Sequence, residues 1–189
     1  YEQWGVDLLQ RVRGMFTFVI WDKNKQELFG ARDHFGIKPF YYAKMNGTFM
    51  YASEIKSLLR HPDFVKELNA EALKPYMTFQ YPAIGETFFK GVYKLPEGHY
   101  FTYRDGKMDI HRYYDEDFRE GKQKLGELVN SIDQTVCDSV KAHQIADVEV
   151  GSFLSSGVDS SYVAAVARPQ HTYSIGFGKG TYNESQQAG

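Results

Sequence analysis

Ser155-Ser156-Gly157-Val158-Asp159-Ser160-Ser161 is the stretch of this sequence that decides the fold around it. The apolar run 148–154 leads into it and predicts a buried strand, whereas the segment 160–167 predicts a helix. A tight loop of small residues therefore joins a strand to the start of a helix. The first turn of a helix presents unpaired backbone N–H groups and the positive end of the helix dipole, so this junction predicts an anion site.

The side chains of the loop suit a phosphate group. Small residues let the backbone approach phosphate oxygens closely, and serine hydroxyls add hydrogen-bond donors. Asp159 is a candidate ligand for a Mg²⁺ ion that bridges phosphates. The loop is not of the Walker type, because Gly-x4-Gly-Lys-Ser/Thr is absent and the loop holds no lysine. The alternative interpretation is an ordinary strand–turn–helix junction with serine caps.

The elements around this loop predict a parallel sheet. Apolar residues recur at helical spacing in 125–142, which predicts an amphipathic helix. Residues 171–177 predict a further strand, and Pro169 ends the helix before it. Alternating helices and strands are typical of a parallel sheet with flanking helices, in which ligands bind at the carboxyl ends of strands. Cys137 lies beside the apolar stripe of the first helix, where we expect a core or boundary residue.

Residues 1–114 predict a different, strand-rich architecture. Residues 14–21 are apolar on both faces, which favours a central strand, and Asn69 is a candidate helix cap. The expected strands are 14–21, 27–32, 39–44, 48–53, 88–93, 98–103 and 107–114, and the expected helices are 54–59 and 69–77. A polar stretch without periodicity follows, so the sequence predicts a domain over 1–118, a linker over 119–124 and a second domain over 125–189.

Composition excludes several classes of function. The chain has 189 residues, of which 42% are hydrophobic and 24% charged, as expected for a globular protein. A net charge of −2 gives no electrostatic basis for binding nucleic acid or an anionic membrane. The longest apolar run, near 15–21, is too short to span a bilayer. The single Cys137 excludes a disulfide within the chain and fits a reducing compartment, so we expect a cytoplasmic protein.

Several segments together resemble the glutamine-hydrolysing asparagine synthetases. The loop Ser155–Ser161 is similar to the Ser-Gly-Gly-x-Asp-Ser pyrophosphate loop of enzymes that split ATP between its α and β phosphates, with Ser156 in place of the first Gly. The other similar segments are Arg13–Asp22, Ala31–Tyr42, Tyr51–Lys56, Lys94–Tyr100, Tyr173–Phe177 and Tyr182–Ser185. They occur in the order that the family has them.

The resemblance implies a fold and an activity. The fold is half of an N-terminal-nucleophile αββα glutaminase sandwich (α+β), followed by the start of an α/β parallel-sheet ATP-pyrophosphatase domain. The activity is synthesis of asparagine from aspartate, glutamine and ATP through β-aspartyl-AMP, with Mg²⁺ at Asp159 and release of AMP and pyrophosphate. The residues implied to bind ATP or pyrophosphate are Phe153, Ser155, Ser156, Gly157, Asp159, Ser160, Ser161 and Ile175. For Phe153 and Ile175 the alternative interpretation is that of buried strand residues.

The sequence also departs from the family. Position 1 is Tyr1 instead of a nucleophilic Cys, and the segments that build the glutamine pocket are missing, so we expect an inactive internal piece without a catalytic residue. Arg32, Asp33 and their neighbours match a family signature that we interpret as structural. Two alternatives stay open for the complete protein: an amidotransferase or β-lactam-type synthetase with another carboxylate acceptor, and a silent nucleotide-binding module. A homodimer is one option for its assembly.

Overall fold

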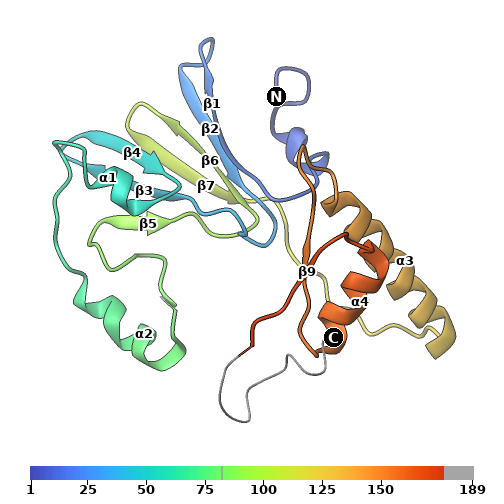
Figure 1. Ribbon diagram of the computed structural model, residues 1–189. Helices are drawn as coiled ribbons and strands as arrows, with labels where there is room; N and C mark the ends of the chain where they lie inside the picture. The colour runs from blue at the N-terminus through green and yellow to red at the C-terminus, as the bar shows by residue number, and fades with distance from the viewer. Residues whose placement is uncertain (82, 177–189) are drawn as a thin grey trace. The chain divides into compact units, whose positions relative to one another are not determined.

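The chain forms two compact units in the computed structural model, which describes residues 1–81 and 83–176 (Figure 1). The first unit is Tyr1–Phe118, and the second begins at Arg119. Two antiparallel sheets build the first unit, and a parallel pair of strands with two helices builds the described part of the second. No helix within the described ranges combines the length and the hydropathy that a membrane crossing requires.

Strands dominate the first unit, as the sequence predicts. The larger sheet has the order β1-β2-β6-β7, the smaller has the order β4-β3-β5, and every pairing is antiparallel. The strands are β1 (Thr17–Asp22), β2 (Glu27–Arg32), β3 (Tyr41–Met45), β4 (Thr48–Ala52), β5 (Val92–Lys94), β6 (His99–Arg104) and β7 (Lys107–Arg112). The helical elements are η1 (Gly5–Gln10), α1 (Ile55–Leu58), η2 (Ala70–Ala72) and α2 (Leu73–Phe79), where η marks a 3₁₀-helix.

Aromatic side chains fill the space between the two sheets. Phe101 of β6 is fully buried there, and the ring of Phe49 from β4 stacks on that of Tyr103 from β6, with 4.2 Å between centroids. Leu9 of η1 packs against the outer face of the larger sheet, and Leu58 of α1 packs against the outer face of the smaller one (Figure 1). The unit is therefore a helix–sheet–sheet–helix sandwich, which confirms the predicted fold class.

Gly30 allows the ring of Phe101 to lie against β2. The two residues face each other across β2 and β6. A Cβ atom at Gly30 would lie 2.3 Å from Cε1 of the Phe101 ring, well inside van der Waals contact. Any side chain at this position would therefore push the ring out of the place from which it reaches the core between the sheets.

Arg32 forms a buried corner at the point where the chain leaves one sheet for the other. Its Nε donates to the carbonyl oxygen of Lys38 at 2.7 Å, and its Nη1 donates to that of Leu95 at 2.6 Å. Its Nη2 donates to the carbonyl oxygen of Gly36. Lys38 leads into the smaller sheet, and Leu95 lies between β5 and β6, so one guanidinium group joins both connections between the sheets.

Asp33 completes this corner from the opposite side of the turn. Its carboxylate accepts the backbone N–H groups of Phe35, Ile37 and Lys38 at 3.2, 2.9 and 2.9 Å. Burial by itself would raise the pKa of Asp33, but the backbone donors outweigh burial and lower the pKa below its usual value. All these groups bond within the corner, which supports the structural interpretation of the Arg32–Asp33 signature.

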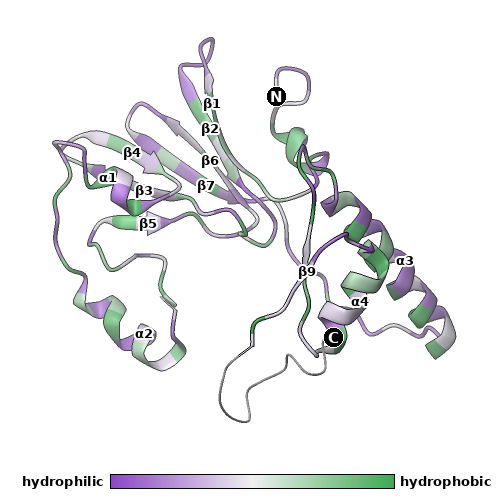
Figure 2. Ribbon diagram, viewed as in Figure 1, coloured by the Kyte–Doolittle hydropathy of each residue, from purple (hydrophilic) through white to green (hydrophobic). Residues whose placement is uncertain are grey.

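The second unit has the predicted order of helix, strand, helix and strand. Its elements are α3 (Leu125–His143), β8 (Ser152–Phe153), α4 (Val158–Ala167) and β9 (Thr172–Tyr173), and β8 pairs with β9 in parallel. Figure 2 shows apolar residues recurring along α3, as the helical periodicity predicts. None of the residues that the structure describes in this unit is buried, so its apolar side chains are largely uncovered within residues 119–176.

Several strand predictions need correction. The segment 148–154 pairs only over Ser152–Phe153, and the segment 171–177 pairs only over Thr172–Tyr173, because within the described residues β8 and β9 have only each other as partners. The segment 88–93 is irregular until β5 begins at Val92. Phe177 and Tyr182–Ser185, which the sequence also singles out, lie outside the described residues.

The prediction of a central strand over 14–21 is wrong. Within the residues that the structure describes, β1 lies at the edge of the larger sheet and pairs only with β2. Phe18 packs into the cluster on the outer face, whereas Val19 packs into the cluster between the sheets. The strand is apolar on both sides because both faces of its sheet are covered, and this pattern does not require a partner strand on each edge.

The helix cap predicted at Asn69 is not formed. Asn69 precedes η2, but its side chain makes no capping bond. Its Nδ2 instead donates to the carbonyl oxygen of Thr87 at 3.1 Å, and the residue is buried. Asn69 therefore ties the helical segment to the chain that leads into β5 instead of closing the helix start.

We expect Gly30→Ala to destabilise the complete protein by about 1–3 kcal/mol, because overpacking at this position displaces the Phe101 ring. Gly85→Ala is the matched control, because a Cβ at Gly85 would meet nothing within 4 Å and its φ lies outside the left-handed region. Chemical denaturation monitored by near-ultraviolet circular dichroism measures both variants. Equal stability of the two variants would contradict this account of Gly30.

We expect Asp33→Asn to lower the free energy of unfolding by roughly 1.5–3 kcal/mol at pH 7, because an amide places a donor against backbone donors. The folded-state pKa of Asp33 is lowered, so the carboxylate stabilises the fold above its unfolded pKa of about 4. That contribution disappears as the pH falls through the folded pKa. The difference between wild type and variant should therefore shrink in urea titrations from pH 7 toward acid. Asp105→Asn, in an exposed turn, is the control and should show no such difference.

Candidate nucleotide-binding loop

The candidate loop follows the carboxyl end of β8. The backbone N–H of Leu154 donates to the carbonyl oxygen of Tyr173 at 2.9 Å, and the hydroxyl of Ser174 donates to the carbonyl oxygen of Leu154 at 2.6 Å. Residues 155–157 then lead into α4, which begins at Val158, two residues earlier than the sequence predicts. The loop thus lies at the carboxyl ends of a parallel strand pair, which is where ligands bind in such sheets.

The hydroxyl of Ser160 holds the loop in its observed shape. Its Oγ accepts the backbone N–H of Ser155 at 3.1 Å and lies 2.8 Å from Ser155 Oγ. The carbonyl oxygens of Ser155 and Gly157 each lie 3.1 Å from the same Oγ, so each is within reach of its single hydrogen. Ser155, Gly157 and Ser160, all predicted from the sequence, are therefore brought together, and the first turn of α4 is tied to the end of β8.

The backbone of the loop accommodates Ser156 without strain. Ser156 does not belong to the described non-glycine residues with positive φ, which are Gln26, Asn46, Gln80, Asp105 and Arg168. Gly157 precedes the helix with an extended backbone, φ −74° and ψ 150°. A Cβ at Gly157 would lie 3.2 Å from Ser155 Oγ, so the close approach at this position suits glycine. Serine in place of the family's first glycine therefore does not require a left-handed backbone conformation at position 156.

Asp159 lies in the first turn of α4, where a carboxylate interacts favourably with the helix dipole. Within the described residues, the side chains of Ser156, Asp159 and Ser161 have no hydrogen-bond partner. Within the described ranges, no three His, Cys, Asp or Glu side chains lie together in a way that could hold a metal ion. A single carboxylate fits Mg²⁺ only together with phosphate oxygens and water, which is how Mg²⁺ commonly binds at nucleotide sites.

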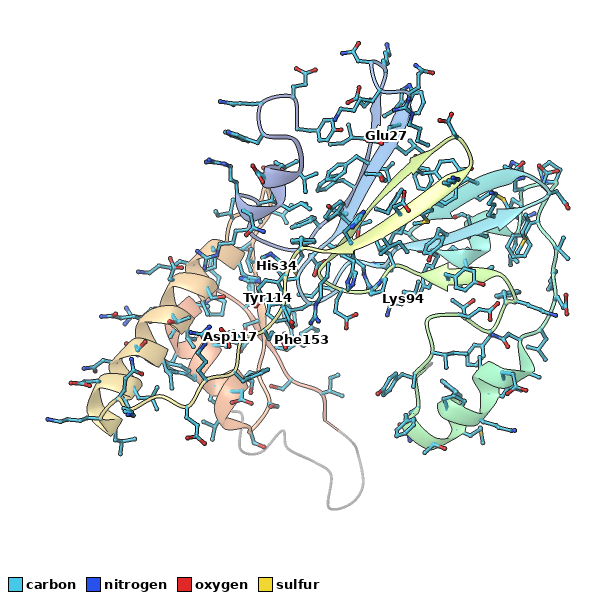
Figure 3. All side chains as sticks on the ribbon, turned by 180° about the vertical axis from the view of Figure 1, so that it is seen from behind. Glu27, His34, Lys94, Tyr114, Asp117 and Phe153 are labelled. Carbon is cyan, nitrogen blue, oxygen red and sulfur yellow. The ribbon has the colours of Figure 1, made fainter. Side chains whose placement is uncertain are left out.

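Phe153 and Ile175 lie near the carboxyl ends of the two parallel strands. They are 75% and 69% exposed, so the alternative interpretation as buried strand residues does not hold within the described chain. The ring of Phe153, labelled in Figure 3, meets that of Tyr173 edge-on, with 6.4 Å between centroids. Two exposed apolar side chains are thus available near the loop, as an adenine or ribose contact requires.

Sequence patterns do not predict the contacts that hold α4 in place. The hydroxyl of Tyr162 in α4 donates to Oδ1 of Asp133 in α3, and Nε2 of Gln144 donates to the carbonyl oxygen of Ala167 at 2.7 Å. The hydrogen bond to Asp133 is the main cause that raises the pKa of Tyr162 to about 12. These pairs are 29 and 23 residues apart in sequence, so no local pattern reveals them.

The arrangement favours binding of an anion. The N–H groups in the first turn of a helix have no acceptor inside the helix, and the dipole places positive charge at the same end. The serine hydroxyls offer further donors, and no bulky side chain precedes Val158 in the loop.

Comparisons with known proteins match two parts of the chain to two families. Residues 1–114 match the family described as "Glutamine amidotransferase domain", and residues 131–189 match the family described as "Asparagine synthase". A solved structure titled as the allosteric regulatory enzyme of purine biosynthesis aligns with 92% of this chain and 35% of that chain, at 13% identity and a TM-score of 0.37. That likeness is too low to carry an argument.

Curated relatives align over nearly the whole chain. Glutamine-hydrolysing asparagine synthetase 1 of Bacillus subtilis is 39% identical over 189 residues, which cover 97% of this chain and 30% of that protein. Glutamine-hydrolysing asparagine synthetase 3 of the same bacterium is 32% identical over 94% of this chain and 30% of that protein. Amidase chry2 of Gibberella zeae is 34% identical over 88% of this chain and 25% of that protein.

The chain thus spans about 30% of the length of the asparagine synthetases it matches. Over that span it joins a glutamine amidotransferase match to the start of an asparagine synthase match, in the order in which the two units occur. By these matches, the chain belongs to the family of glutamine-hydrolysing asparagine synthetases.

Proposed function

We propose that the complete protein synthesises asparagine from aspartate, using ATP and the ammonia released from glutamine. In this reaction the β-carboxylate of aspartate attacks the α-phosphate of ATP, which gives β-aspartyl-AMP and pyrophosphate. Ammonia then displaces AMP. We assign the first of these steps to the loop between β8 and α4 of this chain.

The observation that carries this proposal is the loop between β8 and α4. Departing pyrophosphate accumulates negative charge, and donors that are already oriented stabilise that charge most effectively. Ser155 and Ser160 hold the loop through hydrogen bonds of 2.8–3.2 Å. The N–H groups at the start of α4 and the hydroxyls of Ser156 and Ser161 then supply the donors to phosphate oxygens.

Asp159 is the residue that we assign to Mg²⁺. The ion neutralises phosphate charge and orients the leaving pyrophosphate when it is bound. Asp159 would hold the ion from the first turn of α4, with phosphate oxygens and water as the other ligands. Phe153 and Ile175 would contact the adenosine part of ATP from the ends of β8 and β9. The domain boundary near Phe118 and a cytoplasmic location are part of the same proposal.

A second candidate keeps the chemistry of the loop but changes the acceptor. One relative, at 34% identity, is named an amidase instead of an asparagine synthetase. Members of the family therefore carry different names at similar identity to this chain. An amidotransferase with another carboxylate would use the same loop, and exchange of pyrophosphate into ATP with a panel of carboxylates distinguishes the two.

We expect Asp159→Ala to reduce aspartate-dependent exchange of labelled pyrophosphate into ATP by about 100-fold or more in the complete protein, because the Mg²⁺ ligand is lost. Asp159→Asn tests the charge with less change of shape. Glutaminase activity should persist in both variants, since the amidotransferase match lies in the other unit. Glu120→Ala, which removes an exposed carboxylate of the same unit, is the control. Unchanged exchange in both Asp159 variants would remove the loop from the mechanism.

We expect Ser156→Gly to change the affinity for ATP by less than about tenfold, which corresponds to under roughly 1.4 kcal/mol. The reason is that Ser156 already has a backbone conformation open to any residue, so glycine relieves no strain. Equilibrium titration of the complete protein with ATP measures the change. A much larger gain would mean that the natural loop is impaired and would favour the silent nucleotide-binding module.

A further inference from the structure

A hydrogen bond between two exposed side chains connects α3 to α4 close to the candidate loop. The hydroxyl of Tyr162 donates to Asp133 Oδ1, and the Sγ of Cys137, one turn further along α3, lies 3.9 Å from the same oxygen. The same hydrogen bond is the first cause that raises the pKa of Tyr162 to about 12, so the contact favours the protonated hydroxyl.

Tyr162 stands at a position from which it controls the start of α4. It follows Asp159 by three residues and Ser160 by two, and residues three apart are neighbours on a helix surface. Side chains in a helix lean toward its N-terminus, which is the direction of the turn that contains Asp159. Fixing its hydroxyl on Asp133 therefore fixes the rotation of the first turn of α4 about the helix axis.

The other end of α4 has a comparable contact that serves as an internal reference. Nε2 of Gln144, which follows α3, donates to the carbonyl oxygen of Ala167 at 2.7 Å. Ala167 is the last residue of α4, and the loop lies at the opposite end of this helix. Each contact is one side-chain hydrogen bond between the α3 and α4 segments, but only the contact of Tyr162 lies within one turn of Asp159.

We propose that Asp133 and Tyr162 are positioning residues for the phosphate loop: their hydrogen bond sets the orientation of the first turn of α4, and with it the direction of its N–H donors and of Asp159. This inference rests on the proposed function of the loop. Among residues 1–81 and 83–176, neither side chain forms a hydrogen bond to the loop 155–157, so we infer that both act through the helix. The proposal predicts an effect on ATP use that exceeds any effect on stability.

The test measures pyrophosphate exchange and thermal unfolding in the complete protein. Tyr162→Phe removes only the hydroxyl, and we expect it to raise the KM for ATP about three- to tenfold with little change in Tm, which is the range of one lost hydrogen bond. Asp133→Ala should have the same effect, and the double variant should be no worse than either single variant. Asp133→Asn retains an acceptor oxygen and should restore a KM near that of the wild type.

Gln144→Ala is the matched reference, and we expect it to lower Tm without raising the KM for ATP. Equal effects of Tyr162→Phe and Gln144→Ala on both quantities would reduce the pair to a structural contact and overturn the proposal. Wild-type KM in Tyr162→Phe, while Asp159→Ala abolishes exchange, would overturn it and leave the proposed function intact. Full exchange activity in Asp159→Ala would instead overturn the function of the loop itself.

Discussion

The hydrogen bonds of the Arg32 guanidinium are the interaction on which the first unit depends. A sandwich of two sheets needs its crossing chains held at a fixed point, since the faces themselves meet only through non-directional apolar contact. Arg32 bonds the backbone on both crossings, at Lys38 and at Leu95. Burial of the guanidinium lowers its pKa, but the charge persists because Arg stays protonated far above neutral pH and Asp33 lies beside it. Removing the guanidinium would leave the carbonyl oxygens of Lys38 and Leu95 without this donor.

The second unit depends on local bonds instead. Ser155 and Ser160 are five residues apart, and their bonds shape the loop without any buried residue in 119–176 to support it. Short-range contacts of this kind need little chain closure, so the loop forms from its own sequence. The orientation of α4 is a different matter, because it needs contacts with α3 across 29 residues of chain. The shape of the loop and the direction in which it presents its donors thus have separate origins.

The sequence predicted those features that are local and periodic. Residues 27–32 form a strand with the expected bounds, and the helix expected over 125–142 extends one residue further, to His143. Corrections arose where partner strands decide the outcome. Within the residues that the structure describes, β1 lies at a sheet edge although it is apolar on both faces, and β8 is short because it pairs only with β9. The small residues of the loop, which lie between an apolar run and a helical segment, predicted that the loop serines lie near the start of a helix. The Asp133–Tyr162 contact did not, because side-chain pairing between helices leaves no periodic trace in one sequence.

The hydroxyl of Ser160 has a consequence for how quickly the loop responds to a ligand. A serine has one hydroxyl hydrogen, and the structure places three oxygens within its reach: Ser155 Oγ and the carbonyl oxygens of Ser155 and Gly157. Rotation about a single bond therefore transfers the donation from one oxygen to another while the backbone stays still. Side-chain rotations of this kind take picoseconds to nanoseconds, far less than the time of a loop rearrangement. When a phosphate oxygen enters the loop, the hydroxyl hydrogens can rotate toward it while the heavy atoms keep their positions. The reorganisation energy of this donor network is therefore low.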